Sequence, residues 1–421
     1  MKQLLILGNG FDIACGLESR YCDFFKWRFS RLFHDRTRAE VFKQIKAYVD
    51  NGISWKDKDA TDITMWDYIF LCASICLEDK ETAQWQDVEN IIFNVVSLIL
   101  IGDNYTGANL TFKFKIDSFE EPGKIIFVKF IRKISEKNGE IPETAINLLI
   151  ELKKFEVIFA SYINEIMEKH KELDSKSQTS YKYMAEDLLK RLVGIYNGNE
   201  PFKDLTTDVF SFNYSLNEYN TQRIADRIMS ELAAIGNGKY TWKLNLWYNI
   251  HGVADYQRVS RYLTNGNSAP RPIFGIDNHN ILADNIENDP RIIFTKSFRI
   301  VNDNVNNIRL RDALSNYDLV TVYGHSLGRA DYSYFETFFD KGDLYNSNVR
   351  LEFYYYSGET EKDRMINAIK YNKAVNNLLT YYGQTMGTLH GEDIVNKLTL
   401  EKRLTVKPNP NFIPTQYSII H

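Results

Sequence analysis

The stretch Leu4-Leu5-Ile6-Leu7-Gly8-Asn9-Gly10 near the start of the chain predicts how the fold begins. Four consecutive apolar residues are typical of a strand that is buried on both faces. Glycines end the run, and an amphipathic helix is expected from about Tyr21 to Val49. A short buried strand that leads through a glycine turn into a helix is the opening unit of a doubly wound parallel sheet.

The chain after Pro201 alternates between strand-like and helix-like segments. Strands are expected at 208–212, 243–250, 271–276, 319–323 and 349–356, and helices at 216–232, 304–315, 332–339 and 360–382. Such alternation favours a parallel sheet with helices on both faces. The predicted fold is therefore α/β, with a parallel, doubly wound, Rossmann-like sheet.

The segment from about residue 65 to 197 has a different pattern, with apolar residues at a period near 3.6 and few turns. It predicts a large, mostly helical insertion. We expect residues 1–60 and 200–421 to form a nucleotide-binding α/β domain, and residues 61–199 to form the insertion.

Composition limits the functional classes. The formal net charge of −4 argues against a broad nucleic-acid-binding surface, and no apolar stretch is long enough to cross a membrane. The four cysteines lack zinc-site spacing, so buried reduced thiols and no metal are expected. Such sparse cysteine use fits the cytoplasm.

Three short motifs are candidates for chemistry. The turn Gly8–Asp12 follows the first strand, where glycines let a backbone approach a phosphate, although Asp12 is equally a candidate helix cap. Asn213 follows the predicted strand 208–212, and is either a ligand contact or a helix cap. His251 follows the next strand, and is either a structural histidine or a base that works near neutral pH.

The fourth motif, Gly324-His325-Ser326-Leu327-Gly328, matches the G-x-S-x-G nucleophile elbow of serine hydrolases. Such an enzyme also needs an acid and a histidine, which Asp340, Asp343 or Asp363 with His390 would supply in the required order. The alternative is a glycine turn in which Ser326 caps the next helix.

Together these motifs resemble the AbiH family of abortive-infection proteins. The resemblance rests on I-L-G-N-G-F-D-I-A-C-G-L at 6–17, F-N-Y at 212–214, I-H-G at 250–252, F-G-I-D at 274–277 and G-H-S-L-G-x-x-D at 324–331. The Pro that family members usually carry after the first motif is missing here.

The same order of motifs resembles the sirtuin family of NAD-consuming enzymes, which carry G-A-G-x-S-x-x-x-G-[IL], then N-x-D, H-G and G-x-S. Gly8, Gly10, Gly16 and Leu17 fall at matching spacings. Ser215 stands where sirtuins have Asp, and Asp12 stands where they have Ser.

The sirtuin resemblance implies roles for individual residues. Asn213 would contact the nicotinamide ribose, and His251 would be the catalytic base. The remaining candidates would bind the nucleotide, with the first loop on the pyrophosphate, the later loop on the other ribose, and Asp12 and Asp277 on ribose or water: Gly8, Asn9, Gly10, Phe11, Asp12, Asp277, Gly324, His325 and Ser326.

Because the zinc-binding cysteines of deacetylase sirtuins are absent, the resemblance implies hydrolysis of NAD, as a substrate, rather than peptide deacetylation. It implies an antiphage defence effector. Two alternatives stay open, namely a serine esterase that uses Ser326 and a nucleotide-sensing module without catalysis. A self-toxic enzyme must be held inactive, so we expect activation by homo-oligomerisation or control by an inhibitory or trigger protein.

Overall fold

The computed structural model describes residues 1–32, 40, 43, 47, 50, 63–76, 85–101, 129–134, 140–173, 180–194, 204–236, 240–261, 269–278, 281, 287–302, 317–387 and 391–410. The chain divides into two compact units. The sheet unit comprises residues 1–17, 169–250 and 309–421, and the helical unit comprises residues 18–168 and 251–308.

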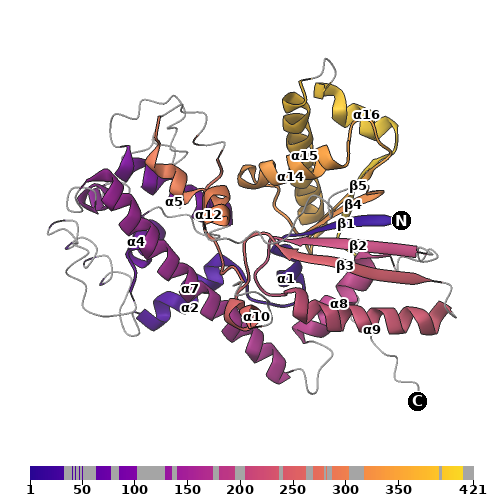
Figure 1. Cartoon of the computed structure of the whole chain (residues 1–421), viewed down its shortest axis with the longest axis horizontal. Coiled ribbons are helices and arrows are strands. Elements are labelled where there is room, and N and C mark those ends of the chain that lie inside the picture. Colours follow the sequence, from indigo (N-terminus) through magenta and orange to yellow (C-terminus); the bar gives the residue numbers. More distant parts are fainter. Residues whose placement is uncertain are drawn as a thin grey trace. The chain divides into compact units, whose positions relative to one another are not determined.

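In the described residues of the sheet unit, six parallel strands form one sheet in the order β3-β2-β1-β4-β5-β6 (Figure 1). Their bounds are β1 (Lys2–Leu7), β2 (Asp204–Ser211), β3 (Thr241–Asn249), β4 (Leu319–Tyr323), β5 (Arg350–Tyr355) and β6 (Leu404–Pro408). This order is typical of dinucleotide-binding sheets. The structure confirms the predicted α/β fold with a parallel, Rossmann-like sheet.

Helices cover both faces of this sheet (Figure 1). The helices of the sheet unit are α1 (Gly10–Ala14), α8 (Tyr181–Leu192), α9 (Glu218–Gly236), α14 (Tyr332–Lys341), α15 (Glu361–Thr385) and α16 (Ile394–Leu400), with short 3-10 turns η4 (Arg329–Asp331) and η5 (Gly391–Asp393). Helices α8 and α9 lie on one face, and α14 and α15 lie on the other.

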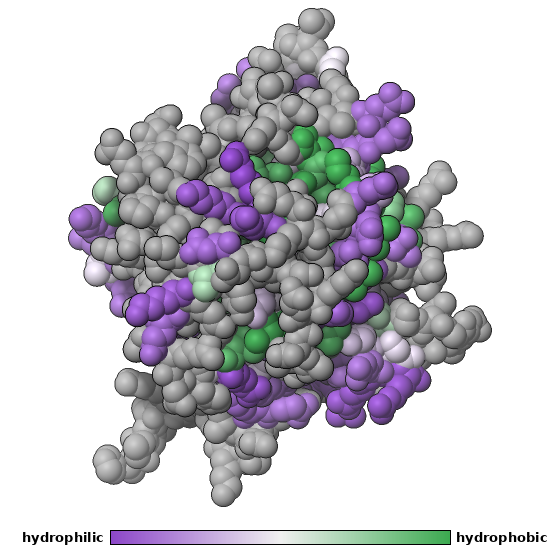
Figure 2. Space-filling model, turned by 90° about the vertical axis from the view of Figure 1, so that its left-hand side faces the viewer, coloured by the Kyte–Doolittle hydropathy of each residue, from purple (hydrophilic) through white to green (hydrophobic). Residues whose placement is uncertain are grey.

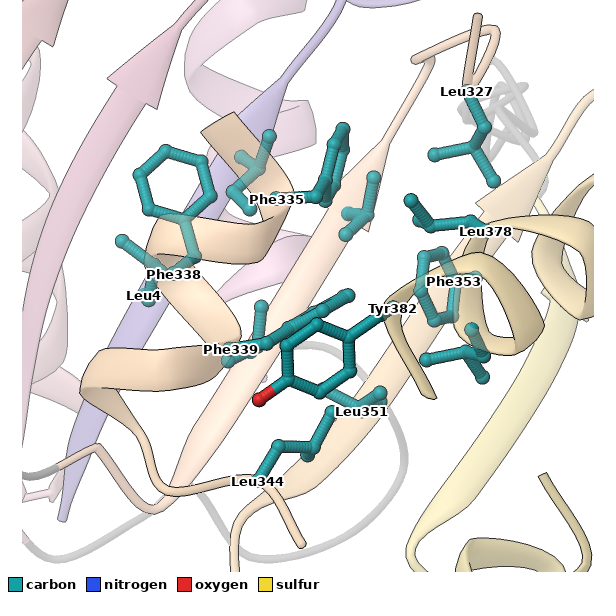
Figure 3. Packing of buried hydrophobic residues seen from close by; sticks show 14 of the residues in the cluster. Leu4, Leu327, Phe335, Phe338, Phe339, Leu344, Leu351, Phe353, Leu378 and Tyr382 are labelled. Atoms are coloured by element: carbon teal, nitrogen blue, oxygen red, sulfur yellow. The ribbon is translucent and has the colours of Figure 1, made fainter. Parts of the chain in front are cut away.

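Strand β1 shows why helices cover both faces of the sheet. Leu4, Leu5, Ile6 and Leu7 are all fully buried, and successive side chains of a strand point to opposite faces. Leu4 and Ile6 belong to the core cluster formed with α14 and α15 (Figure 3). Leu5 packs on the opposite face, with residues of α8 and α9. The continuous apolar run is therefore what a central parallel strand requires.

The helical unit contains α2 (Tyr21–Leu32), α4 (Met65–Cys76), α5 (Trp85–Leu100), most of α7 (Ile141–Leu173), α10 (Tyr256–Ser260), the 3-10 turn η3 (Pro290–Phe294) and α12 (Lys296–Asn302). Its core is aromatic. Phe24 and Phe155 pack edge to face at 5.4 Å between ring centroids, and Phe159 packs on Phe274 at 5.0 Å.

A buried ion pair anchors the motif F-G-I-D of the helical unit. Arg299 donates to Glu156 over 2.8 Å, and both side chains are almost completely buried. Glu156 also accepts a hydrogen bond from the backbone N–H of Phe274 over 2.7 Å, and Arg299 donates to the carbonyl oxygen of Phe274 over 2.8 Å. Charged side chains thus bind a backbone segment that the sequence predicted to be a strand.

That predicted strand, 271–276, is wrong. Only an isolated bridge forms, between Ile276 and Thr295, because the N–H of Phe274 bonds to a side chain instead of a neighbouring strand. The edge strand β6 was not predicted. The predicted helix 304–315 lies outside the described residues, and the helix expected from Tyr21 is described as far as Leu32.

The domain boundaries expected at residues 60 and 199, between the α/β domain and the helical insertion, stay a prediction. The compact units are divided elsewhere, and helix α8, which was expected in the insertion, belongs to the sheet unit. The side chains of Cys15 and Cys72 are buried, and that of Cys22 is half-buried.

Among the described residues, no helix is long and apolar enough to span a membrane. Figure 2 shows hydrophobic residues in separate small groups among hydrophilic ones on the face that it presents.

Candidate functional site

The strand order of the sheet unit reverses between β1 and β4, whose neighbours lie on opposite sides. In open parallel sheets, ligands bind at the carboxyl ends of the strands next to such a reversal. The loops that leave β1, β2 and β4 at this edge carry the motifs at Gly8, Asn213 and Gly324. The topology therefore gathers three of the four candidate motifs at one edge.

Two glycine turns cross each other at the reversal. The N–H of Gly8 donates to Tyr323 over 2.9 Å, and the N–H of Gly10 donates to the carbonyl oxygen of Gly324 over 2.8 Å. A Cβ atom at Gly8 would lie 2.5 Å from the Cα of His325, and one at Gly10 would lie 2.6 Å from the Cα of Gly324. These glycines are thus required by the contact between the two turns, a role that their spacing did not reveal.

Helix α1 contributes few donors for a phosphate. Its first N–H groups, at Gly10 and Phe11, donate to the carbonyl oxygens of Gly324 and Gly8. The side chain of Phe11 is buried and packs edge to face on Tyr323 at 6.2 Å. A pyrophosphate at this turn would need other donors than these two N–H groups.

Asp12 lies inside α1, after the N-cap residue Asn9, so the helix-cap interpretation of Asp12 is wrong. Its side chain is only 2% exposed. Tyr181 of α8 donates to it over 2.6 Å, and the hydroxyl of Ser215 donates to it over 2.8 and 2.7 Å. Burial raises the pKa of Asp12 to about 6, against hydrogen bonds from Tyr181 and Ser215 that lower it.

Asn213 follows β2 by two residues and is 4% exposed. Its side-chain amide donates to the carbonyl oxygen of Gly8 over 3.0 Å. Its Oδ1 atom is buried and has no hydrogen-bond partner among the described residues. The N-cap position of α9 belongs to Asn217, which accepts hydrogen bonds from the N–H groups of Tyr219 and Asn220, so Asn213 is not a helix cap.

Asn249, the last residue of β3, fixes the backbone around Asn213. Its side-chain amide donates to the carbonyl oxygens of Asn213 and Leu216, each over 2.8 Å. Sequence reasoning missed Asn249, although it stands beside the I-H-G motif. It also missed Tyr181, which no local pattern connects with Asp12.

The turn at Gly324 does not have the geometry of a nucleophile elbow, in which the serine occupies a strained turn between strand and helix. Here Leu327, rather than Ser326, has a positive φ of 55°, and α14 begins only at Tyr332. Ser326 is exposed and does not cap that helix, whose N-cap is Asp331.

His325 shapes this turn from inside. It is 4% exposed, and its Nδ1 accepts a hydrogen bond from the N–H of Leu327 over 3.0 Å. Its Nε2 lies 3.4 Å from a carboxylate oxygen of Asp331, and its ring packs on Phe212 at 4.5 Å. An imidazole with these contacts is not placed to serve as a base for Ser326.

The acids of the hydrolase interpretation also have structural contacts. Asp340 accepts from the hydroxyl of Tyr382, Asp343 accepts from Asn346, and Asp363 forms a capping box with Thr360. His390 lies outside the described residues.

His251 and Asp277 belong to the helical unit. His251 is 5% exposed, and its carbonyl oxygen accepts from the N–H of Ile273 over 2.9 Å. Gly252 follows with a φ of +89°, and a Cβ there would lie 2.1 Å from the carbonyl oxygen of Arg271. Asp277 is also 5% exposed, so it is not the solvated loop carboxylate that is the commoner case.

The comparison with protein families decides what the chain is related to. The model of the family described as bacteriophage abortive infection AbiH matches residues 4–355. The chain belongs to the AbiH family. The match runs from β1 to the end of β5 and includes all four motifs. Membership in AbiH gives this chain its broad function, which is abortive-infection defence against bacteriophage.

No curated protein and no solved structure matched the AbiH chain. The finer assignment of its chemistry therefore comes from the geometry of the site.

Proposed function

We propose that this AbiH protein acts in abortive infection by hydrolysing NAD to ADP-ribose and nicotinamide. Water is the second substrate, and the bond that breaks joins the nicotinamide nitrogen to its ribose. The observation that carries the proposal is the Oδ1 atom of Asn213. It is buried at the carboxyl edge of a 3-2-1-4-5-6 sheet, and no described residue donates a hydrogen bond to it.

A buried acceptor without a donor is unfavourable, by about 1–3 kcal/mol, unless a ligand supplies the donor. A ribose hydroxyl is such a donor, and the sheet order is that of dinucleotide-binding proteins. The amide group of Asn213 is held in two ways, by its own bond to Gly8 and by the bond that Asn249 donates to the backbone carbonyl oxygen of Asn213. Because this acceptor is held in one orientation, it determines where a ribose hydroxyl binds.

The base of the reaction is His251 in this proposal. It follows the last residue of β3 by two positions, so chain connectivity keeps it close to the end of that strand. A neutral imidazole accepts a proton near neutral pH, either from the ribose hydroxyl or from the attacking water. The proton that water loses would therefore pass to His251 as the C–N bond breaks.

The other residues that are expected to contact the nucleotide have smaller roles in this proposal. Gly324 and Ser326 offer a turn and an exposed hydroxyl for the second ribose, with His325 holding the shape of that turn. Asn9 and Asp277 remain candidates for polar contacts to the nucleotide. The pyrophosphate is bound by donors other than the N–H groups of Gly10 and Phe11, since these are occupied.

Control of the activity belongs to the same proposal. A protein that destroys NAD must be inactive before infection, so assembly of copies of this chain, or release from a protein inhibitor, precedes turnover.

The test is a time course of NAD and nicotinamide with purified protein, with and without lysate of infected cells. We expect NAD to fall in the wild type and to persist with Asn213→Ala and His251→Ala. Ser326→Ala should weaken the binding of NAD but still hydrolyse it. Binding of NAD without loss would indicate a sensing module instead. Labelling of Ser326 by a fluorophosphonate, with NAD intact, would indicate a serine hydrolase.

A further inference from the structure

Asp12 and Ser215 depart from the sirtuin pattern in opposite directions, and they are in direct contact. The hydroxyl of Ser215 donates to both carboxylate oxygens of Asp12, over 2.8 and 2.7 Å. We infer that the two residues are one carboxylate–hydroxyl pair whose members have exchanged places, and that this pair positions Asn213 for the nucleotide. The inference rests on the proposed function in naming NAD as that nucleotide.

The pair joins the two loops on which the site depends. Asp12 belongs to α1, which follows β1, and Ser215 follows Asn213 by two residues after β2. A second bond between the same loops is made by Asn213 itself, to Gly8. Because Asn213 bonds to Gly8 and Ser215, two residues later, bonds to Asp12, the backbone at Asn213 is held in one place and the amide keeps its direction.

Burial explains why the pair needs one carboxylate and one hydroxyl. Asp12 is 2% exposed and Ser215 is 5% exposed, so a carboxylate at this place needs donors from the protein. Two hydroxyls would leave the site without a charged acceptor. Two carboxylates would repel each other, and one would have to take up a proton.

Tyr181 allows the carboxylate and the hydroxyl of the pair to exchange positions. Its hydroxyl donates to Asp12 over 2.6 Å and lies 2.9 Å from the Oγ atom of Ser215. The same donor therefore reaches a carboxylate at either position. The carboxylate that is missing at residue 215 is thus present in the cluster, supplied from residue 12.

The experiment compares the wild type with Asp12→Ser, Ser215→Asp and the double exchange Asp12→Ser/Ser215→Asp. Each protein is assayed for NAD loss, for its unfolding midpoint, and for protection of cells against a phage that the wild type restricts. Each single variant should lose at least about tenfold in activity, as expected for a broken charged hydrogen bond. The double exchange should recover to within about threefold of the wild type, because the two changes are coupled.

A double exchange that is as inactive as the single variants, or that fails to fold, would overturn the inference. So would single variants with wild-type activity. The two proposals can fail separately. If NAD falls in the wild type but not in the exchange, the pair is wrong and NAD hydrolysis stands. If phage protection follows the exchange while NAD stays intact in the wild type, the pair stands and the substrate is another nucleotide.

Discussion

The side-chain amide of Asn213 donates a hydrogen bond to the carbonyl oxygen of Gly8 over 3.0 Å, and so joins the loop after β2 to the loop after β1. The bond spans 205 residues of sequence. It turns the remaining oxygen of the amide into a fixed, buried acceptor at the edge where the strand order reverses.

Asn213→Ala should lower NAD turnover by about a hundredfold, the effect typical of removing one preorganised polar group from an active site. The loss of its bond to Gly8 should lower the free energy of unfolding by only about 1 kcal/mol. Asn217→Ala is the matched control, since Asn217 caps α9. That variant should also lose about 1 kcal/mol but keep its turnover. Equal turnover losses in both variants would contradict a functional role for Asn213.

Gly10→Ala should prevent stable folding or lower the free energy of unfolding by about 3 kcal/mol or more, because its Cβ would lie 2.6 Å from the backbone of Gly324. Gly16 provides the comparison. It has a φ of +85°, and no atom of the described residues lies within 4 Å of a Cβ built there, so Gly16→Ala should cost about 1 kcal/mol through backbone strain alone. Urea unfolding of both variants measures the difference. A Gly10 variant as stable as the Gly16 variant would show that the two turns are not in contact.

Asp12 should make the free energy of unfolding depend on pH. Its pKa rises from 3.8 to about 6 on folding, so folding favours the protonated form. The resulting stabilisation is complete below the lower value and is lost as the pH rises through the higher one, by about 3 kcal/mol in total. The other groups around Asp12 are Ser215, Tyr181 and Cys15. Burial holds the pKa of Tyr181 and that of Cys15 well above their usual values. The negative charge of Asp187 also raises the pKa of Cys15.

The measurement is urea unfolding of the wild type and of Asp12→Asn at intervals between about pH 4 and about pH 7. Asp12→Asn has no proton to exchange at this site, so its stability should fall less than that of the wild type over the same range. Parallel curves for the two proteins would show that residue 12 does not titrate there.

The pair of Glu156 and Arg299 should govern the stability of the helical unit. Glu156→Gln or Arg299→Met leaves one buried charge without its partner, which should lower the free energy of unfolding by about 3–5 kcal/mol. The double variant should lose less than the sum of the two, since no lone charge remains. It should still be less stable than the wild type, because the carbonyl oxygen of Phe274 loses the hydrogen bond that Arg299 donates. Additive losses would contradict the coupling.

The sequence predicted the parts of this fold that depend on local patterns. The apolar run Leu4–Leu7 and the glycine turn after it predicted a central strand and its exit, and the ends of β2 and β4 placed Asn213 and Gly324 at the same edge. Strand β6 was not predicted, because it is a short edge strand whose residues are at most half-buried.

Long-range contacts set the limit of such prediction for the site. In the sequence, Asp12 and Ser215 are two separate departures from the sirtuin pattern. Only the fold shows that the two side chains touch, across 203 residues, and that Tyr181 serves both. The glycines at positions 8 and 10 were likewise recognised, but their contact partner, the turn at Gly324, was not.

The most direct test of the central claim is the NAD content of infected cells, followed over time in cells that produce the wild type or Asn213→Ala. Infection supplies whatever trigger the protein needs. We predict that NAD falls and nicotinamide rises in wild-type cells before phage are released, and that NAD stays at its uninfected level with Asn213→Ala. Cells that are protected by the wild type while their NAD remains constant would contradict the claim.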